Sequence, residues 1–143
     1  LLAIAPAPVL AGPDRAPIWP PGILGSITHC EDYACAVVGS AAEWSAIGLD
    51  AELVQVLEPE IVDDILLDTE RDQDPCVVFS IKEAFYKAVY PRLQRILEFH
   101  DVEVRLHADR FEARLVIPDR RILAVIEGRF EVGPERVTSV VAL

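Results

Sequence analysis

The stretch VVFSIKEAFYKAVY, residues 77–90, decides the fold. Its apolar residues recur at helical spacing, at positions 78, 81, 85, 88 and 89, and neither Gly nor Pro interrupts it before Pro91. This pattern predicts one long, buried helix. Glu83 lies opposite the centre of the apolar stripe, but Phe79, Tyr86 and Tyr90 flank it. Because a carboxylate among aromatic side chains is costly unless a cation or a proton meets it, Glu83 requires a partner.

The rest of the chain supplies strands that can cover this helix. Turn residues separate four β-rich runs after the helix, at residues 102–106, 111–117, 122–130 and 137–143. Before the helix we expect a Pro-rich extended arm (1–21), a strand or loop (22–30), strands at 33–38 and 47–52, and a short helix at 59–67. A long helix against an antiparallel sheet closes naturally into an α+β domain.

Composition excludes several classes of protein. The chain has 143 residues, room for one domain with a real core, and is 52% hydrophobic. Its 13 basic and 24 acidic residues give a net charge of -11, which argues against a nucleic-acid surface. Cys30, Cys35 and Cys76 form neither an even set nor a CxxC pair, so we expect reduced thiols rather than disulfides or structural zinc.

Nothing in the sequence predicts a membrane protein. No apolar run approaches the roughly 18 residues that a spanning helix needs. The apolar start, residues 1–10, lacks a basic region and is broken by Pro6 and Pro8, so we expect no signal peptide and a cytoplasmic protein. The sequence contains no Met, even at position 1, and we expect the natural protein to begin before Leu1.

Asp50 and Glu52 are candidate ligands for a metal ion. They are two residues apart in a predicted strand and therefore project to the same side. A hard divalent cation relieves the repulsion between them, and Glu83 would complete an oxygen-lined site. The alternative is that both acids simply form a solvated strand end.

Lys82, Lys87 and His29 also have two interpretations each. The lysines flank Glu83, and Lys87 either faces phosphate oxygens or forms an ordinary i, i+4 ion pair with Glu83. His29 is either a donor to phosphate or a core histidine.

A metal nuclease is an alternative function that would also use two neighbouring acids. Such enzymes need a lysine two residues after the second acid, where this chain has Val54.

Three motifs taken together closely resemble the 4′-phosphopantetheinyl transferase superfamily, of the surfactin and enterobactin type. They are, in order, GSITHC (25–30), IGLDAE (47–52) and FSIKEAFYKA (79–88). RAPIWPPG (15–22) is similar to the stretch that precedes them in that family. The similarity extends over roughly residues 8–106 and includes the final strands only by general character.

The resemblance implies a pseudo-dimer of two α+β lobes with coenzyme A in the cleft between them. Residues 1–46 would be the remnant of an incomplete N-terminal lobe that carries the coenzyme A motif. Residues 47–143 would be the C-terminal lobe with the metal site and the long helix. We expect a monomer with this internal pseudo-twofold.

The resemblance also implies the reaction. The 4′-phosphopantetheine arm of coenzyme A passes to a serine of an acyl or peptidyl carrier protein, as in siderophore or polyketide biosynthesis, and 3′,5′-ADP leaves. Asp50, Glu52 and Glu83 would hold Mg²⁺ or Mn²⁺, and Glu83 would take the serine proton. Coenzyme A would be bound by Arg15, Thr28, His29, Lys82 and Lys87, and the catalytic residues would be Glu83, Lys87 and His29. The alternative is a non-catalytic relic that binds a carrier protein or coenzyme A.

Overall fold

The computed structural model describes residues 6–143. Its strands are β1 (Leu10–Ala11), β2 (Pro17–Ile18), β3 (Ile23–Cys30), β4 (Tyr33–Ser40), β5 (Ile47–Leu53), β6 (Val102–His107), β7 (Arg110–Leu115), β8 (Ile126–Val132) and β9 (Arg136–Ala142). Its helices are α1 (Pro59–Ile65) and α2 (Pro75–Leu93), with short 3₁₀ turns η1 (Asp68–Glu70) and η2 (Phe99–Asp101).

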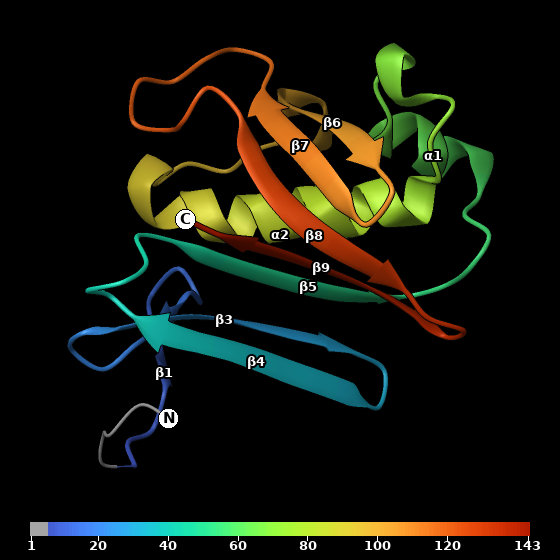
Figure 1. Cartoon of the computed structure of the whole chain (residues 1–143). Helices are drawn as coiled ribbons and strands as arrows, with labels where there is room; N and C mark the ends of the chain where they lie inside the picture. Colours follow the sequence, from blue (N-terminus) through green and yellow to red (C-terminus); the bar gives the residue numbers. More distant parts are fainter. Residues whose placement is uncertain (1–5) are drawn as a thin grey trace.

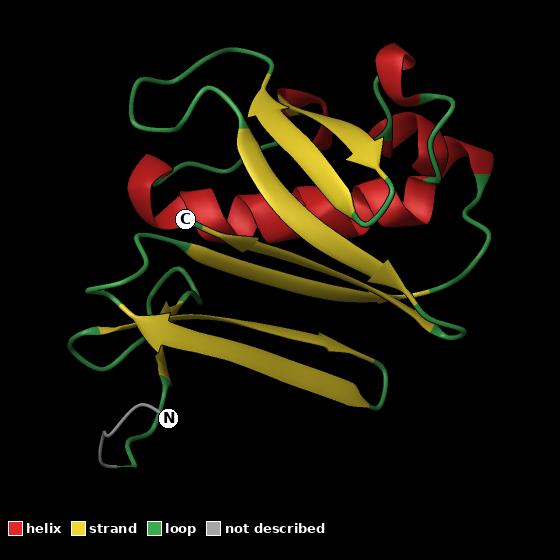
Figure 2. Ribbon diagram, in the orientation of Figure 1, coloured by secondary structure: helices red, strands yellow, loops and turns green. Residues whose placement is uncertain are grey.

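One antiparallel sheet and one long helix form the main body of the molecule. The sheet has five strands in the order β5-β9-β8-β7-β6, and every neighbouring pair is antiparallel. Helix α2 lies along one face of this sheet (Figures 1 and 2). The α+β prediction is therefore confirmed. The described residues contain one such lobe, and the pseudo-dimer remains an expectation from the family resemblance.

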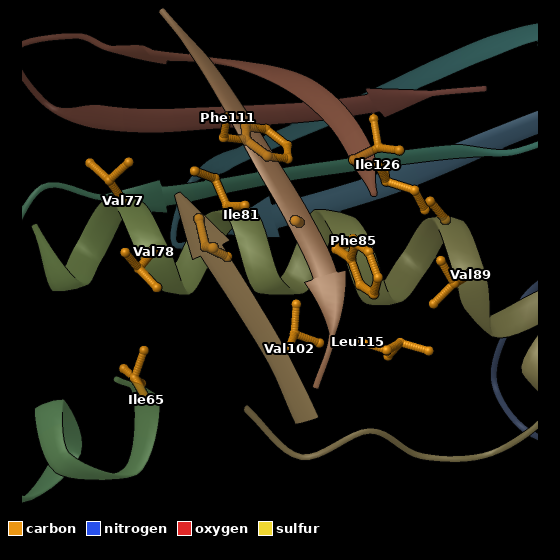
Figure 3. Packing of buried hydrophobic residues seen from close by; sticks show 14 of the residues in the cluster. Ile65, Val77, Val78, Ile81, Phe85, Val89, Val102, Phe111, Leu115 and Ile126 are labelled. Carbon is orange, nitrogen blue, oxygen red and sulfur yellow. The ribbon is translucent and has the colours of Figure 1, made fainter. Parts of the chain in front are cut away.

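The core lies between α2 and the sheet. The apolar stripe predicted on the helix is buried, and Val78, Ile81, Phe85 and Val89 are each no more than 1% exposed. Their partners from the sheet side are also buried (Figure 3), and these are Val102, Phe111, Leu115 and Ile126. Full burial of each such side chain contributes about 1.5–3 kcal/mol, so this stripe fixes which face of α2 meets the sheet.

Helix α2 is longer than the sequence pattern predicts at both ends. Asp74 caps its start, because Asp74 Oδ1 accepts hydrogen bonds from the backbone N–H groups of Cys76 and Val77 at 2.9 and 3.3 Å. The helix also continues through Pro91 for two residues. Arg121 Nη1 donates to the carbonyl oxygen of Leu93 at 3.1 Å and so satisfies part of the helix end.

Gly48 lets α2 approach β5 without a spacer. A Cβ atom at position 48 would overlap the carbonyl oxygen of Ala84 and lie 2.8 Å from the backbone nitrogen of Ala88. The helix backbone therefore rests directly on the strand at this point. Asp50 and Glu52 alternate with Gly48 on the same side of β5, so they face the helix.

The β3–β4 hairpin forms a second, two-stranded sheet that lies beside the β5 edge (Figure 1). The strand-or-loop region thus becomes a strand of eight residues, and β4 extends to Ser40. The expected extended arm is only partly extended. Residues 1–5 lie outside the described residues, and β1 and β2 form a small hairpin whose turn contains Arg15 at φ 67°.

Two further predictions concern the last strands and the absence of a membrane span. The strand expected at 122–130 begins only at Ile126, because residues 116–125 form a connection with several exposed apolar side chains. No helix in residues 6–143 combines the length and the hydropathy required to cross a membrane.

Candidate active site

Asp50, Lys87 and Thr28 meet at the centre of the α2–β5 contact. Lys87 Nζ donates to Asp50 Oδ1 at 2.6 Å and lies 3.5 Å from Thr28 Oγ1. The Thr28 hydroxyl donates to the same oxygen, Asp50 Oδ1, at 3.2 Å. Three elements, β3, β5 and α2, therefore converge on one carboxylate oxygen.

The second oxygen of Asp50 has no partner. Asp50 is 2% exposed, and its Oδ2 is buried without a hydrogen-bond donor. Leaving a buried carboxylate oxygen unpaired is costly, and such an atom in a native fold requires an explanation such as a bound ion. The site thus holds one satisfied and one vacant carboxylate position.

Glu52 and Glu83 share the electrostatic environment of Asp50. Burial, followed by the charge of Asp50, raises the pKa of Glu52 from 4.5 to about 7, while Lys87 opposes the shift. Burial and the charge of Asp50 also raise the pKa of Glu83. The charge of Asp50 thus destabilises the ionised forms of Glu52 and Glu83, and Lys87 offsets only part of that effect.

This donor set fits a hard divalent cation in its chemistry. Carboxylate oxygens suit Mg²⁺ and Mn²⁺. A cation would give Asp50 Oδ2 a partner and would lower the raised pKa values of Glu52 and Glu83. The acids are not assembled in advance, because among residues 6–143 no group of three or more His, Cys, Asp or Glu side chains is placed to hold a metal ion. The Lys87 ammonium instead neutralises Asp50.

Lys82 does not lie at this site, which corrects the expectation that it binds coenzyme A. Its side chain is 1% exposed and its Nζ pairs with Glu70 Oε2 at 2.7 Å. The same nitrogen donates to the carbonyl oxygens of Ile65 and Phe99 at 2.8 and 3.0 Å. All three ammonium hydrogens therefore have protein acceptors, and none remains for a phosphate.

Thr28 and His29 point to opposite sides of β3. Thr28 is 3% exposed and its only hydroxyl hydrogen is donated to Asp50, so it cannot donate to a phosphate as expected. His29 is exposed, and alternation along the strand carries it away from Asp50 and Lys87. Arg15 is exposed in the β1–β2 turn, beside Asp14, whose carboxylate accepts from the Tyr90 hydroxyl at 2.9 Å.

Sequence reasoning missed two polar residues close to the acids. Ser139 lies directly opposite Asp50 in the β5–β9 register, and its Oγ accepts from Ser80 Oγ at 3.0 Å beneath α2. Both serines are fully buried. The alternation of residues 136–142 places Ser139 on the same buried side as Val137 and Val141, and this was the available signal.

Comparison with known proteins identifies the class of protein. Residues 46–137 match the model of the 4′-phosphopantetheinyl transferase superfamily, and residues 1–39 match the model of the 4′-phosphopantetheinyl transferase N-terminal domain. The chain belongs to the 4′-phosphopantetheinyl transferase superfamily, a family of enzymes.

Individual relatives agree with this family. The chain is 34% identical to 4′-phosphopantetheinyl transferase PptT of Mycobacterium tuberculosis over 162 residues, which cover 99% of this chain and 71% of PptT. It is 34% identical to 4′-phosphopantetheinyl transferase Svp of Streptomyces mobaraensis, with 99% of this chain and 65% of Svp covered. Enterobactin synthase component D of Salmonella typhimurium is 34% identical over 94 residues, 57% of this chain and 38% of that protein.

Proposed function

We propose that this chain transfers the 4′-phosphopantetheine arm of coenzyme A to a serine of an acyl or peptidyl carrier protein, with release of 3′,5′-ADP. One observation carries the proposal. In a chain of this family, the buried carboxylate of Asp50 presents one vacant oxygen, beside Lys87 and two further acids of raised pKa. Phosphoryl transfer depends mostly on positioning and on charge neutralisation, which this arrangement can supply.

Asp50, Glu52 and Glu83 are the residues that would hold Mg²⁺, with Mn²⁺ as an alternative. A bound Mg²⁺ supplies Lewis-acid stabilisation of the charge that develops on the pyrophosphate oxygens. Asp50 would contribute its second oxygen, Oδ2, since Oδ1 already accepts from Lys87 and Thr28. Glu52 and Glu83 would contribute as ionised groups, which a nearby positive charge favours.

Lys87 and Glu83 perform the remaining steps. Lys87 lies one helical turn after Glu83 on α2, and its side chain is 28% exposed, so the ammonium can reach a phosphate oxygen while it stays close to Asp50. Glu83 accepts the proton of the carrier serine as the serine oxygen attacks the β-phosphate of coenzyme A and 3′,5′-ADP leaves. Burial and the charge of Asp50 raise the pKa of Glu83 above its ordinary value, so this carboxylate accepts a proton more readily than an exposed glutamate does.

Arg15 and His29 are assigned to the nucleotide end of coenzyme A. Both are exposed, and alternation along β3 turns His29 away from Asp50. This assignment rests on the family motif, and His29 is given no part in the proton transfer.

Mass spectrometry of a carrier protein tests the proposal. An apo carrier protein incubated with this chain, coenzyme A and Mg²⁺ should gain one phosphopantetheine arm, and a carrier whose acceptor serine is replaced by alanine should gain none. EDTA should stop the reaction and excess Mg²⁺ should restore it. An unmodified carrier, with coenzyme A bound to the folded chain, would instead identify a non-catalytic relic, which the lack of a preassembled metal cluster in residues 6–143 would then explain.

A further inference from the structure

Two hydroxyl side chains of β3 attach the β3–β4 hairpin to the edge of β5. Ser26 Oγ accepts from the backbone N–H of Leu49 at 2.9 Å and donates to the carbonyl oxygen of Leu49 at 3.4 Å. Thr28 Oγ1 accepts from the backbone N–H of Ala51 at 3.1 Å. β3 and β5 belong to different sheets, so these side chains take the place of a backbone ladder.

Only Thr28 continues this connection to the acid. Its oxygen accepts the Ala51 N–H, so its single hydrogen is directed to Asp50 Oδ1. Ala51 follows Asp50 in the strand, and the hydroxyl is thus anchored to the backbone of the strand whose side chain it orients. Asp50 Oδ1 then receives two donors, Thr28 and Lys87, while Oδ2 receives none.

We propose that Thr28 is a positioning residue for Asp50. Its hydroxyl fixes the rotation of the carboxylate, so that Oδ1 stays with Lys87 and Oδ2 stays vacant for a divalent cation. The inference rests on the proposed function for its catalytic consequence, but its effect on cation binding is independent of turnover. Groups that orient a metal ligand in this way typically change metal affinity or activity about 10- to 100-fold when they are removed.

Ser26 provides a matched control within the same strand. It is 4% exposed, against 3% for Thr28, and bonds the backbone of the same neighbouring strand, but its hydroxyl forms no hydrogen bond with Asp50 or Lys87. Loss of either hydroxyl removes a bond that attaches the hairpin. Loss of the Thr28 hydroxyl alone also releases the carboxylate.

The experiment compares Thr28→Val, Thr28→Ser and Ser26→Ala in the full chain. Mn²⁺ affinity is measured without coenzyme A by electron paramagnetic resonance, and kcat and KM for carrier modification are measured separately. Thr28→Val should weaken Mn²⁺ binding about 10-fold and lower kcat about 10- to 100-fold, while Thr28→Ser should restore both. Ser26→Ala should keep Mn²⁺ affinity within about twofold, although its melting temperature falls as in Thr28→Val.

Each other outcome has a definite meaning. Equal loss of Mn²⁺ affinity in Thr28→Val and Ser26→Ala, or none in Thr28→Val, overturns the positioning role. So does a wild-type chain that binds no Mn²⁺. A wild-type chain that binds Mn²⁺ in the expected order of variants but modifies no carrier overturns the proposed function and leaves the positioning role intact. If Thr28→Val does not fold, Thr28→Cys replaces the hydroxyl by a weak donor, and it should lose Mn²⁺ affinity several-fold relative to Thr28→Ser, which lacks the same methyl group.

Discussion

The ammonium of Lys87 lies 2.6 Å from Asp50 Oδ1, and Asp50 is almost completely buried while Lys87 remains partly open to solvent. A buried carboxylate needs a compensating positive charge, and here helix α2 provides it from one side only. The same lysine only partly offsets the cost of ionising Glu52 and Glu83, whose pKa values remain raised. A second cation near these acids would therefore favour their ionised forms.

Replacement of Lys87 should separate cation binding from catalysis. In Lys87→Gln the positive charge that repels a divalent cation is gone. Mn²⁺ affinity without coenzyme A should therefore rise on the order of 10-fold. Carrier modification should fall about 100-fold or more, since a charged donor to phosphate is lost. Isothermal titration with Mn²⁺ and a kinetic assay give the two values, and Lys87→Arg is the control that keeps the charge. Weaker Mn²⁺ binding in Lys87→Gln would show that Lys87 supports the cation rather than opposing it.

Glu83→Gln tests the proton acceptor. The substitution keeps shape and removes charge, so kcat should drop about 10²- to 10⁴-fold, the usual contribution of a general base. The melting temperature should not fall, because the raised pKa of Glu83 shows that its ionised form is disfavoured in the fold. Glu60→Gln on the exposed side of α1 is a control of the same chemistry and should leave kcat unchanged. Turnover like that of the wild type in Glu83→Gln would contradict the assignment.

Stability of the metal-free chain should depend on pH through Glu52. Its folded pKa is about 7 against an ordinary 4.5, so between these values the folded chain holds a proton that the unfolded chain has lost. The free energy of unfolding should therefore fall as pH rises from about 4.5 to about 7, and Glu83 should add to the trend. Urea denaturation in EDTA measures it. Glu52→Gln should flatten the curve, and parallel curves for the two chains would show that Glu52 is not responsible.

The buried Lys82–Glu70 pair should be essential for stability. Burial lowers the pKa of Lys82 and Glu70 partly offsets this, while Glu70 also accepts the backbone N–H of Leu67 at 2.8 Å and that of Val104. Lys82→Met leaves a buried carboxylate without its cation and should cost about 3–5 kcal/mol in urea denaturation.

A surface pair serves as the comparison for Lys82. The Arg71–Asp63 pair is exposed, so Arg71→Met should cost no more than about 1 kcal/mol. Adding Glu70→Gln to Lys82→Met should recover part of the loss, because the unpaired charge disappears while Val104 keeps an acceptor. Equal losses for Lys82→Met and Arg71→Met would remove the stabilising role of the buried pair.

The sequence predicted the helix, the sheet and the acids because each has a periodic signal. Positions 78, 81, 85, 88 and 89 define a face that is buried in the structure. The i, i+2 spacing of Asp50 and Glu52 places both on the side of β5 that faces α2. These features depend on local geometry, which the order of residues records directly.

The roles of Thr28 and Lys82 could not be read in the same way, because they depend on contacts between distant residues. Consecutive residues of a strand project to opposite sides. The motif contains both Thr28 and His29, and it does not tell which of the two side chains faces the acids. Lys82 is adjacent to Glu83 on the helix, yet its partner Glu70 lies in η1. The helix end is a separate case: Pro91 predicted that the helix stops there, but the structure ends it two residues later, at Leu93.

The glycine at position 48 affects the site as well as the packing of the helix. Because helix and strand touch backbone to backbone there, a side chain as short as aspartate spans the gap from β5 to Lys87. A methyl group at position 48 would force the helix outward and leave the Asp50 carboxylate short of its lysine. Positions 48 and 50 are thus coupled, because a larger residue at position 48 would require a longer acid at position 50 to keep the contact with Lys87.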